Sequence, residues 1–194
     1  MVAEIRARAQ QRDRLVDWIV VALVVAALLV GWGIKAAAEG RTVAVEAEGL
    51  QLRYPAGWVR ANVEPPVLLR AEEWLGPARS TITVERRPLP PVQNPLRAVQ
   101  QTLTLERART WTAYRTLETE EGASVAGRPA TRVAFTYVET NPNPYLATMP
   151  VVMYGEDYLI QVGNDVYVVT LTAAEAYYGR AQRALAGVVR SLPR

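Results

Sequence analysis

The longest apolar stretch of the sequence runs from Trp18 to Ile34 and contains no charged residue. A helix rises about 1.5 Å per residue, so this stretch is about 25 Å long. Extension past a snorkelling Lys35 to Ala38 gives about 31 Å, close to the hydrocarbon thickness of a bilayer. The pattern therefore predicts one transmembrane helix over residues 18–38, acting as a signal anchor.

The flanking charges predict how this helix is oriented. Four arginines precede the helix, whereas Lys35 and Arg41 follow it. Because cations near a span remain on the cytoplasmic side, we expect residues 1–17 in the cytoplasm and the carboxyl-terminal domain outside the cell membrane. The alternative is a signal peptide cleaved after Ala38, since Ala36, Ala37 and Ala38 fit the small-residue rule for processing. The long apolar core and the seventeen preceding residues favour the anchor.

Small residues recur four positions apart within the apolar stretch. Ala22 and Ala26 form one such pair, and Ala27 and Gly31 form another. This spacing lets a second membrane helix approach closely, so these four residues are candidates for helix packing. The alternative is an alanine-rich helix that faces lipid alone.

Alternating apolar and polar residues follow the apolar stretch. Leu50, Leu52 and Tyr54 alternate with polar neighbours, as in a half-buried strand. Residues 39–48 are either a tether or a first strand, and residues 49–194 are expected to form one domain. Further strands are predicted over residues 67–72, 80–87, 111–121, 130–138, 149–162 and 166–172. The last two suggest a hairpin, and Gly155-Glu156-Asp157 is read as either a bulge or a second turn.

Two helices are predicted within the domain. Asn94 can cap the first and Pro95 suits its first position. Thr172 to Glu175 reads as a capping box for the second. The apolar stripe of this second helix comprises Tyr178, Ala181, Leu185, Val188 and Leu192. The predicted class is α+β, with an antiparallel sheet flanked by helices as an α/β/α sandwich.

Four short segments carry a family resemblance: Leu50 to Trp58 (LQLRYPAGW), Gly127 to Ala130, Asp165 to Val169, and Val188 to Leu192. Through them, residues 49–192 resemble the PsbP-like superfamily, which includes an extrinsic subunit of photosystem II and bacterial exported proteins. The resemblance implies an antiparallel sheet between helices. It also implies a binding or assembly role, because such domains generally carry no catalytic constellation.

Composition removes several classes of chemistry. The chain has no histidine and no cysteine, which excludes serine–histidine triads, thiolate zinc sites and iron–sulfur clusters. Lys35 is the single lysine, so a P-loop lysine in the domain is excluded too. Residues 39–194 carry 17 arginines and 16 acidic residues, a balance that argues against nucleic-acid binding.

Carboxylates remain available for chemistry. Three adjacent pairs occur, at Glu72-Glu73, Glu120-Glu121 and Glu156-Asp157, but neighbours on a strand point to opposite faces. We therefore predict no catalytic residue, cofactor or metal site, although the oxygens of Glu156, Asp157, Asn164 and Asp165 leave weak metal binding open. An exported, carboxylate-dependent hydrolase of envelope polysaccharide is the alternative function.

The sequence favours a non-enzymatic accessory protein, anchored in the membrane, that binds another membrane or envelope protein. Trp and Tyr dominate protein interfaces, and Trp74 and Tyr177 are the candidate partner contacts. No small-molecule substrate is expected.

Overall fold

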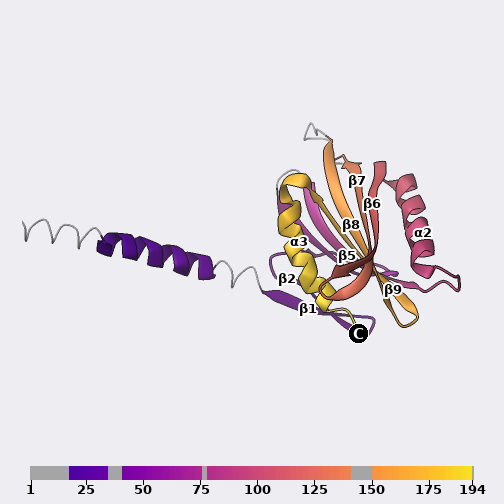
Figure 1. The fold of residues 1–194 in the computed structure, drawn as a ribbon, viewed down its shortest axis with the longest axis horizontal. Coiled ribbons are helices and arrows are strands. Elements are labelled where there is room, and N and C mark those ends of the chain that lie inside the picture. The colour runs from indigo at the N-terminus through magenta and orange to yellow at the C-terminus, as the bar shows by residue number, and fades with distance from the viewer. Residues whose placement is uncertain (1–17, 35–40, 76–77, 141–149, 194) are drawn as a thin grey trace, which may run out of the picture. The chain divides into compact units, whose positions relative to one another are not determined.

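The computed structural model describes residues 18–34, 41–75, 78–140 and 150–193 (Figure 1). The chain divides into two compact units, Met1–Arg41 and Thr42–Arg194. In the first unit, residues 18–34 form a helix whose side chains are exposed along its whole length. Among the described residues, none of the helices combines the length and the apolar character that crossing a bilayer requires. The predicted cytoplasmic segment 1–17 and the end of the predicted span, 35–38, lie outside the described residues.

The second unit begins with a two-stranded hairpin. β1 (Thr42–Ala47) pairs antiparallel with β2 (Leu50–Pro55), so part of the segment left open as tether or strand is a strand. Glu48 and Gly49 form the turn, both with positive φ (49° and 77°), a conformation that matches the twist of a two-residue hairpin. Leu52 is fully buried and ties the hairpin to the main core.

The main sheet has seven strands in the order β3-β4-β5-β9-β8-β7-β6, and all neighbouring strands are antiparallel. Its strands are β3 (Val59–Arg60), β4 (Val67–Leu75), β5 (Ala78–Pro88), β6 (Thr112–Val125), β7 (Arg128–Glu139), β8 (Val151–Val162) and β9 (Asp165–Ala174). The central position of β9 explains its almost continuous run of buried residues, since both of its faces are covered.

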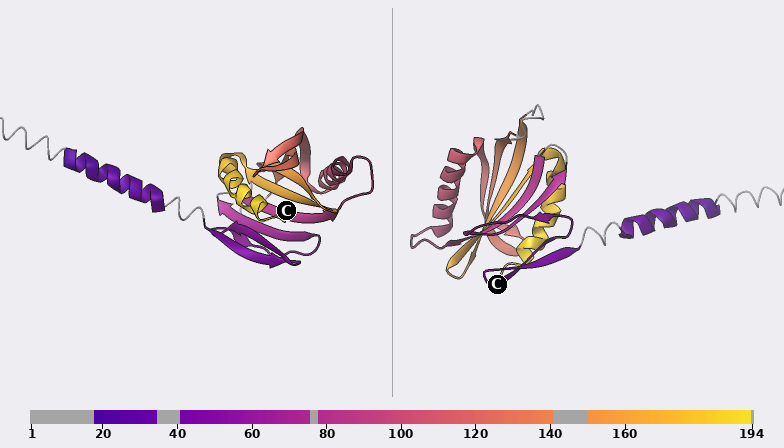
Figure 2. Two further views of the ribbon diagram at one scale, coloured as in Figure 1. Left: turned by 60° about the horizontal axis from the view of Figure 1, so that its bottom comes forward. Right: turned by 180° about the vertical axis from the view of Figure 1, so that it is seen from behind.

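One helix packs on each face of this sheet (Figure 2). α3 (Glu175–Arg190) buries Leu185 and Val188 against Val169 and Leu171 of β9. α2 (Pro95–Thr110) buries Val99 and Leu103 against other residues of the same strand, Val166 and Val168. Because successive residues of a strand point to opposite faces, the two helices cover opposite faces. The predicted antiparallel α+β architecture is confirmed.

Two local predictions are wrong, and a third, the Asn94 cap, is only partly right. Thr172 does not cap a helix, because β9 continues through it to Ala174 and α3 begins at Glu175 without a side-chain cap. Asn94 does occupy the cap position of α2, yet its side chain makes no capping hydrogen bond. Gly155 to Asp157 form neither a bulge nor a turn, since β8 pairs in unbroken register with both β7 and β9 through these residues.

Candidate functional site

A pocket of ≈ 340 Å³ lies on the α2 face of the sheet, beyond the carboxyl end of that helix. We call it the polar pocket. Its floor consists of four threonines on two neighbouring strands. Thr81 of β5 pairs with Thr172 of β9, and Thr83 pairs with Thr170. The rest of its lining includes Arg70, Arg79, Trp111, Tyr137 and Glu139. Hydroxyl groups thus replace the valines and leucines that cover this face under α2.

Charged residues of β4 and β5 form one wall of the polar pocket. Glu72 accepts a hydrogen bond from Arg70 Nε at 2.8 Å and a longer one from Arg79 Nη1 at 3.4 Å. Arg79 Nη2 lies 3.8 Å from Glu139 Oε1. All of these side chains project from the α2 face, since Arg70 pairs with Thr83 and Glu72 with Thr81 across the two strands. One carboxylate therefore positions two guanidinium groups.

Aromatic rings form the opposite wall. Trp111 follows α2 directly, and its ring centroid lies 4.4 Å from that of Tyr137 on β7. Burial raises the pKa of the Tyr137 hydroxyl above its ordinary value, an effect that the neighbouring Thr172 only partly offsets. The hydroxyl therefore stays protonated at neutral pH and is able to donate a hydrogen bond.

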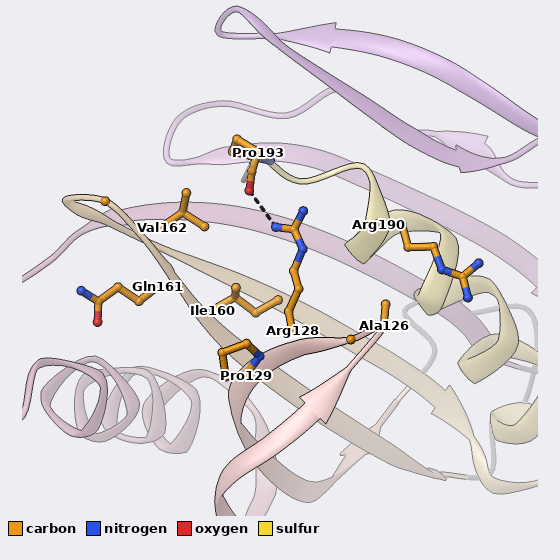
Figure 3. Close-up of a pocket in the computed structure, with 10 residues that line it drawn as sticks. Ala126, Arg128, Pro129, Ile160, Gln161, Val162, Arg190 and Pro193 are labelled. Atoms are coloured by element: carbon orange, nitrogen blue, oxygen red, sulfur yellow. Dashed lines mark hydrogen bonds between the residues drawn. The ribbon is translucent and has the colours of Figure 1, made fainter.

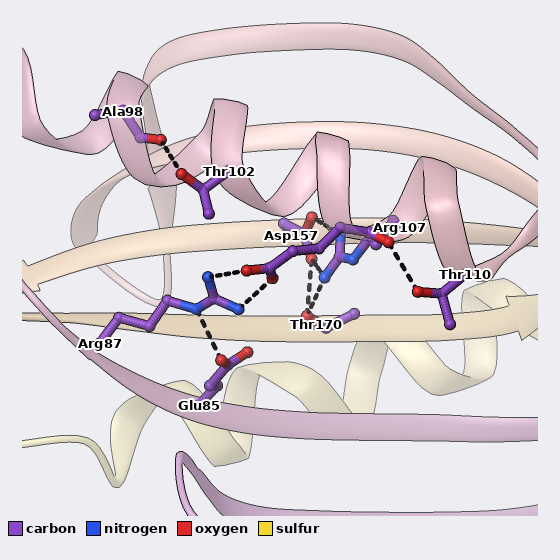
Figure 4. Close-up of polar contacts among 9 residues, drawn as sticks. Glu85, Arg87, Ala98, Thr102, Arg107, Thr110, Asp157 and Thr170 are labelled. Atoms are coloured by element: carbon purple, nitrogen blue, oxygen red, sulfur yellow. Dashed lines mark hydrogen bonds and ion pairs between the residues drawn. The ribbon is translucent and has the colours of Figure 1, made fainter.

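A buried ion pair joins α2 to β8 and contacts Thr170 of the pocket floor (Figure 4). Arg107 of α2 binds both carboxylate oxygens of Asp157, and its Nη2 lies 2.7 Å from Oδ1. The Thr170 hydroxyl donates to the same oxygen at 2.8 Å and accepts from Arg107 at 3.0 Å. The guanidinium also lies over the rings of Trp111 and Phe135, 4.9 and 4.7 Å from their centroids. This pair fixes the end of α2, which places Trp111 beside the pocket.

A second charged cluster lies on the α3 face. Glu156 is only 1% exposed; it accepts hydrogen bonds from Arg132 Nε at 2.9 Å and from the Tyr158 hydroxyl at 2.6 Å. Arg132 also reaches Glu118 and Glu120 of β6. Burial tends to raise the pKa of Glu156, but the hydrogen bond from Tyr158 and the contact with Arg132 hold it below the ordinary value. The cluster joins the edge strand β6 to the interior.

A larger pocket, of ≈ 700 Å³, lies at the carboxyl end of α3 and is lined by Arg128 and Arg190 (Figure 3). Arg128 donates to the carbonyl oxygens of Leu192 and Pro193, at 2.7 Å each. These bonds satisfy carbonyl groups that follow the helix, so the Arg128 side chain has a structural role there.

Of the predicted partner contacts, Trp74 lies at the edge of the polar pocket and Tyr177 does not. Trp74 is 63% exposed, and the guanidinium of Arg79, a pocket residue, lies 5.0 Å from the centre of its ring. Tyr177 is partly buried against Met153 and Ala174. Ala22, Ala26, Ala27 and Gly31 lie on the exposed helix 18–34, where their role in packing stays a prediction.

The structure separates the oxygens that left weak metal binding open. Glu156 and Asp157 project from opposite faces of β8 toward different arginines, whereas Asn164 and Asp165 lie at the β8–β9 turn. Among the described residues, no group of three or more acidic residues is arranged to hold a metal ion.

The hydrophobic pattern alone does not indicate the polar pocket. Its signal in the sequence is the Thr-x-Thr spacing within two of the predicted strands, at residues 81–83 and 170–172. Such spacing places both hydroxyls on one face of a strand. What the spacing cannot reveal is that β5 and β9 are neighbours, since they are far apart in the chain.

No protein-family model and no curated protein matches this sequence. Among solved structures, the chain is similar to the Ran-binding protein Mog1p of Saccharomyces cerevisiae, with a TM-score of 0.47, 16% identity, and coverage of 78% of this chain and 94% of that one. It is similar to cyanobacterial PsbP from Synechocystis sp. PCC 6803, with a TM-score of 0.47, 12% identity, and coverage of 78% and 89%. A Pseudomonas aeruginosa protein of unknown function gives a TM-score of 0.43 and 13% identity, over 80% and 99%. Likenesses at this level concern the fold alone.

Proposed function

We propose that this protein is a non-enzymatic accessory protein, anchored in the membrane through residues 18–38, whose extracytoplasmic domain binds a protein partner at the polar pocket. The observation that carries the proposal is Trp74, a large exposed aromatic ring beside a cavity lined by arginines and hydroxyls. Interfaces concentrate their binding energy in tryptophan, tyrosine and arginine. The apolar stretch and the arginines before it support the anchor and its orientation.

The arrangement of carboxylates does not favour the alternative of a polysaccharide hydrolase. Such enzymes need two carboxyl groups facing each other across one bond. Glu73 binds Arg180 of α3, while its neighbour Glu72 binds Arg70 on the other face of the sheet. Glu156 and Asp157 diverge in the same way.

Photo-crosslinking in intact membranes tests the partner. A photoreactive amino acid replaces Trp74 in one variant and Leu105, an equally exposed residue of α2, in the control. We expect a discrete protein adduct from position 74 and none from position 105. Equal labelling from both positions, or no adduct from position 74, would contradict the proposal.

Protease treatment of intact spheroplasts tests the topology. We expect digestion of the carboxyl-terminal domain without lysis, because the arginines place the amino end inside. Full protection of the domain until lysis would rule this topology out.

A further inference from the structure

The charged side chains at the polar pocket differ in how exposed they are to solvent. The side chains of Arg70 and Arg79 are 43% and 32% exposed, whereas that of Glu72 is 12% exposed. Glu72 thus lies beneath the two guanidinium groups and orients them, and the cations occupy the mouth. Arg70 is the most exposed of the four charges, since the side chains of Arg79 and Glu139 are 32% and 26% exposed, so a ligand that approaches this wall meets the Arg70 guanidinium first, although the group as a whole is neutral.

Arg70 commits one edge of its guanidinium to Glu72. Only its Nε takes part in that bond, and its two terminal nitrogens make no hydrogen bond with another residue in the described part of the chain. A guanidinium held in this way presents two parallel N–H groups, the arrangement that binds a carboxylate through both oxygens. The ion pairs of Arg79 are long, at 3.4 and 3.8 Å, and its guanidinium also lies over the Trp74 ring, so Arg79 is held less firmly by carboxylates than Arg70 is.

Other groups of the polar pocket add hydrogen-bond donors near Arg70. Tyr137 lines the same pocket as Arg70, and its hydroxyl is one such donor. Thr83, in the floor, pairs directly with Arg70 across β4 and β5. Glu139 is the opposing charge at this wall, and its 3.8 Å contact with Arg79 leaves it loosely held.

We propose that the polar pocket recognises an aspartate or glutamate side chain of the partner protein, with an apolar neighbour of that residue resting on Trp74. This inference rests on the proposed function and specifies the chemistry of its partner. The pocket volume of ≈ 340 Å³ is large enough to admit an acidic side chain. The two guanidinium groups at the mouth suit the acidic side chain, and the flat apolar ring of Trp74 suits an apolar neighbour such as leucine.

The test uses the full chain in lipid nanodiscs and two short probes, Ac-Leu-Glu-Leu-NH2 and its glutamine analogue, Ac-Leu-Gln-Leu-NH2. Binding is followed through the indole N–H resonance of Trp74 in nitrogen-15 spectra. We expect the glutamate peptide to bind about tenfold more tightly, the difference that a charge-assisted pair produces. Equal affinity for the two peptides would overturn the inference.

Matched variants test which residues produce the preference for the glutamate peptide. Arg70→Gln is expected to abolish the preference for glutamate, whereas Arg60→Gln, on the adjacent strand β3, is expected to preserve it. Thr83→Val, which keeps the side-chain shape, is expected to weaken the preference without abolishing it. Thermal midpoints check that each variant is folded. A preference that survives Arg70→Gln would overturn the assignment.

A third probe, the glutamine peptide with a free carboxyl end, separates a side chain from a chain terminus. Binding of this probe alone would overturn recognition of an acidic side chain. If Trp74 crosslinks a partner but the peptides bind equally, the inference fails and the proposed function stands. If the peptides discriminate but no partner is crosslinked, the proposed function fails while the preference for glutamate stands.

Discussion

Gly155 has room for no side chain, because the ring of Phe135 on the neighbouring strand occupies that space. A Cβ at position 155 would lie 2.3 Å from two ring atoms. The glycine therefore lets Phe135 lie across β8, where its ring supports the Arg107 guanidinium. Glycine usually indicates a turn, but Gly155 lies inside a strand and is required there for packing.

We expect Gly155→Ala to destabilise the fold by about 1–3 kcal/mol, the usual cost of overpacking. Gly179→Ala is the matched control, since a Cβ there meets no atom within 4 Å and alanine favours helix. That control should leave stability unchanged or raise it by about 0.5–1 kcal/mol. Urea unfolding measures both, and equal losses would contradict the packing argument.

The Arg107–Asp157 pair gives a second prediction for single residues. Arg107→Ala should lower the free energy of unfolding by about 3–5 kcal/mol, because it leaves the buried Asp157 carboxylate without a cation. Arg97→Ala, at an exposed position of the same helix, should change it by less than about 0.5 kcal/mol. Replacing Arg107 and Asp157 together by leucine should recover much of the loss. A double variant no more stable than Arg107→Ala would show that the buried charge is not the cause.

Among the elements, α3 agrees best with its sequence pattern. Ala181, Leu185 and Val188 are buried in the main core, as the helical spacing predicts. Its start differs from the prediction, because Thr172 and Ala173 continue the ladder with β5 and β8 instead of capping a helix. Pairing with two strands satisfies more backbone groups than one side-chain cap does.

The packing of α3 predicts unequal effects from two residues of the helix that are near neighbours in sequence. Leu185→Ala should lower stability by about 2–5 kcal/mol, since the side chain is buried over the sheet and a cavity would remain. Arg183→Ala, exposed on the other side of the helix, should cost less than about 0.5 kcal/mol. Thermal midpoints of the two variants distinguish the cases. Similar midpoints would mean that α3 does not cover the sheet through this stripe.

For the domain as a whole, Glu156 links stability to pH. Its pKa in the folded state is lowered from an ordinary value of 4.5, so its contribution is fully present above that pH and disappears as pH falls through the lowered value. Stability should therefore decline below about pH 4.5. Glu156→Gln should lower the free energy of unfolding by about 2–3 kcal/mol at pH 7. It should also make the decline of stability below pH 4.5, which we call the acid limb, less steep.

The exposed Glu121→Gln is the control for this acid limb. Urea unfolding at pH 7 and at several values below pH 4.5 measures the effect. An acid limb that is the same in Glu156→Gln as in the original protein would show that Glu156 does not contribute to it.

The sequence by itself determined most of the strands, the two domain helices and the buried face of α3, because these follow from periods of two and 3.6 residues that each segment carries alone. It left β1 open between strand and tether, and it gave no sign of the two-residue β3. It also identified Trp74 as a candidate contact. Only the tertiary structure decided that β5 lies beside β9, which joins threonines about ninety positions apart into one floor. It likewise decided that Arg107 meets Asp157 and that Gly155 lies against Phe135. Those contacts depend on strand order and register between distant segments, and no local pattern of hydrophobic and polar residues specifies either.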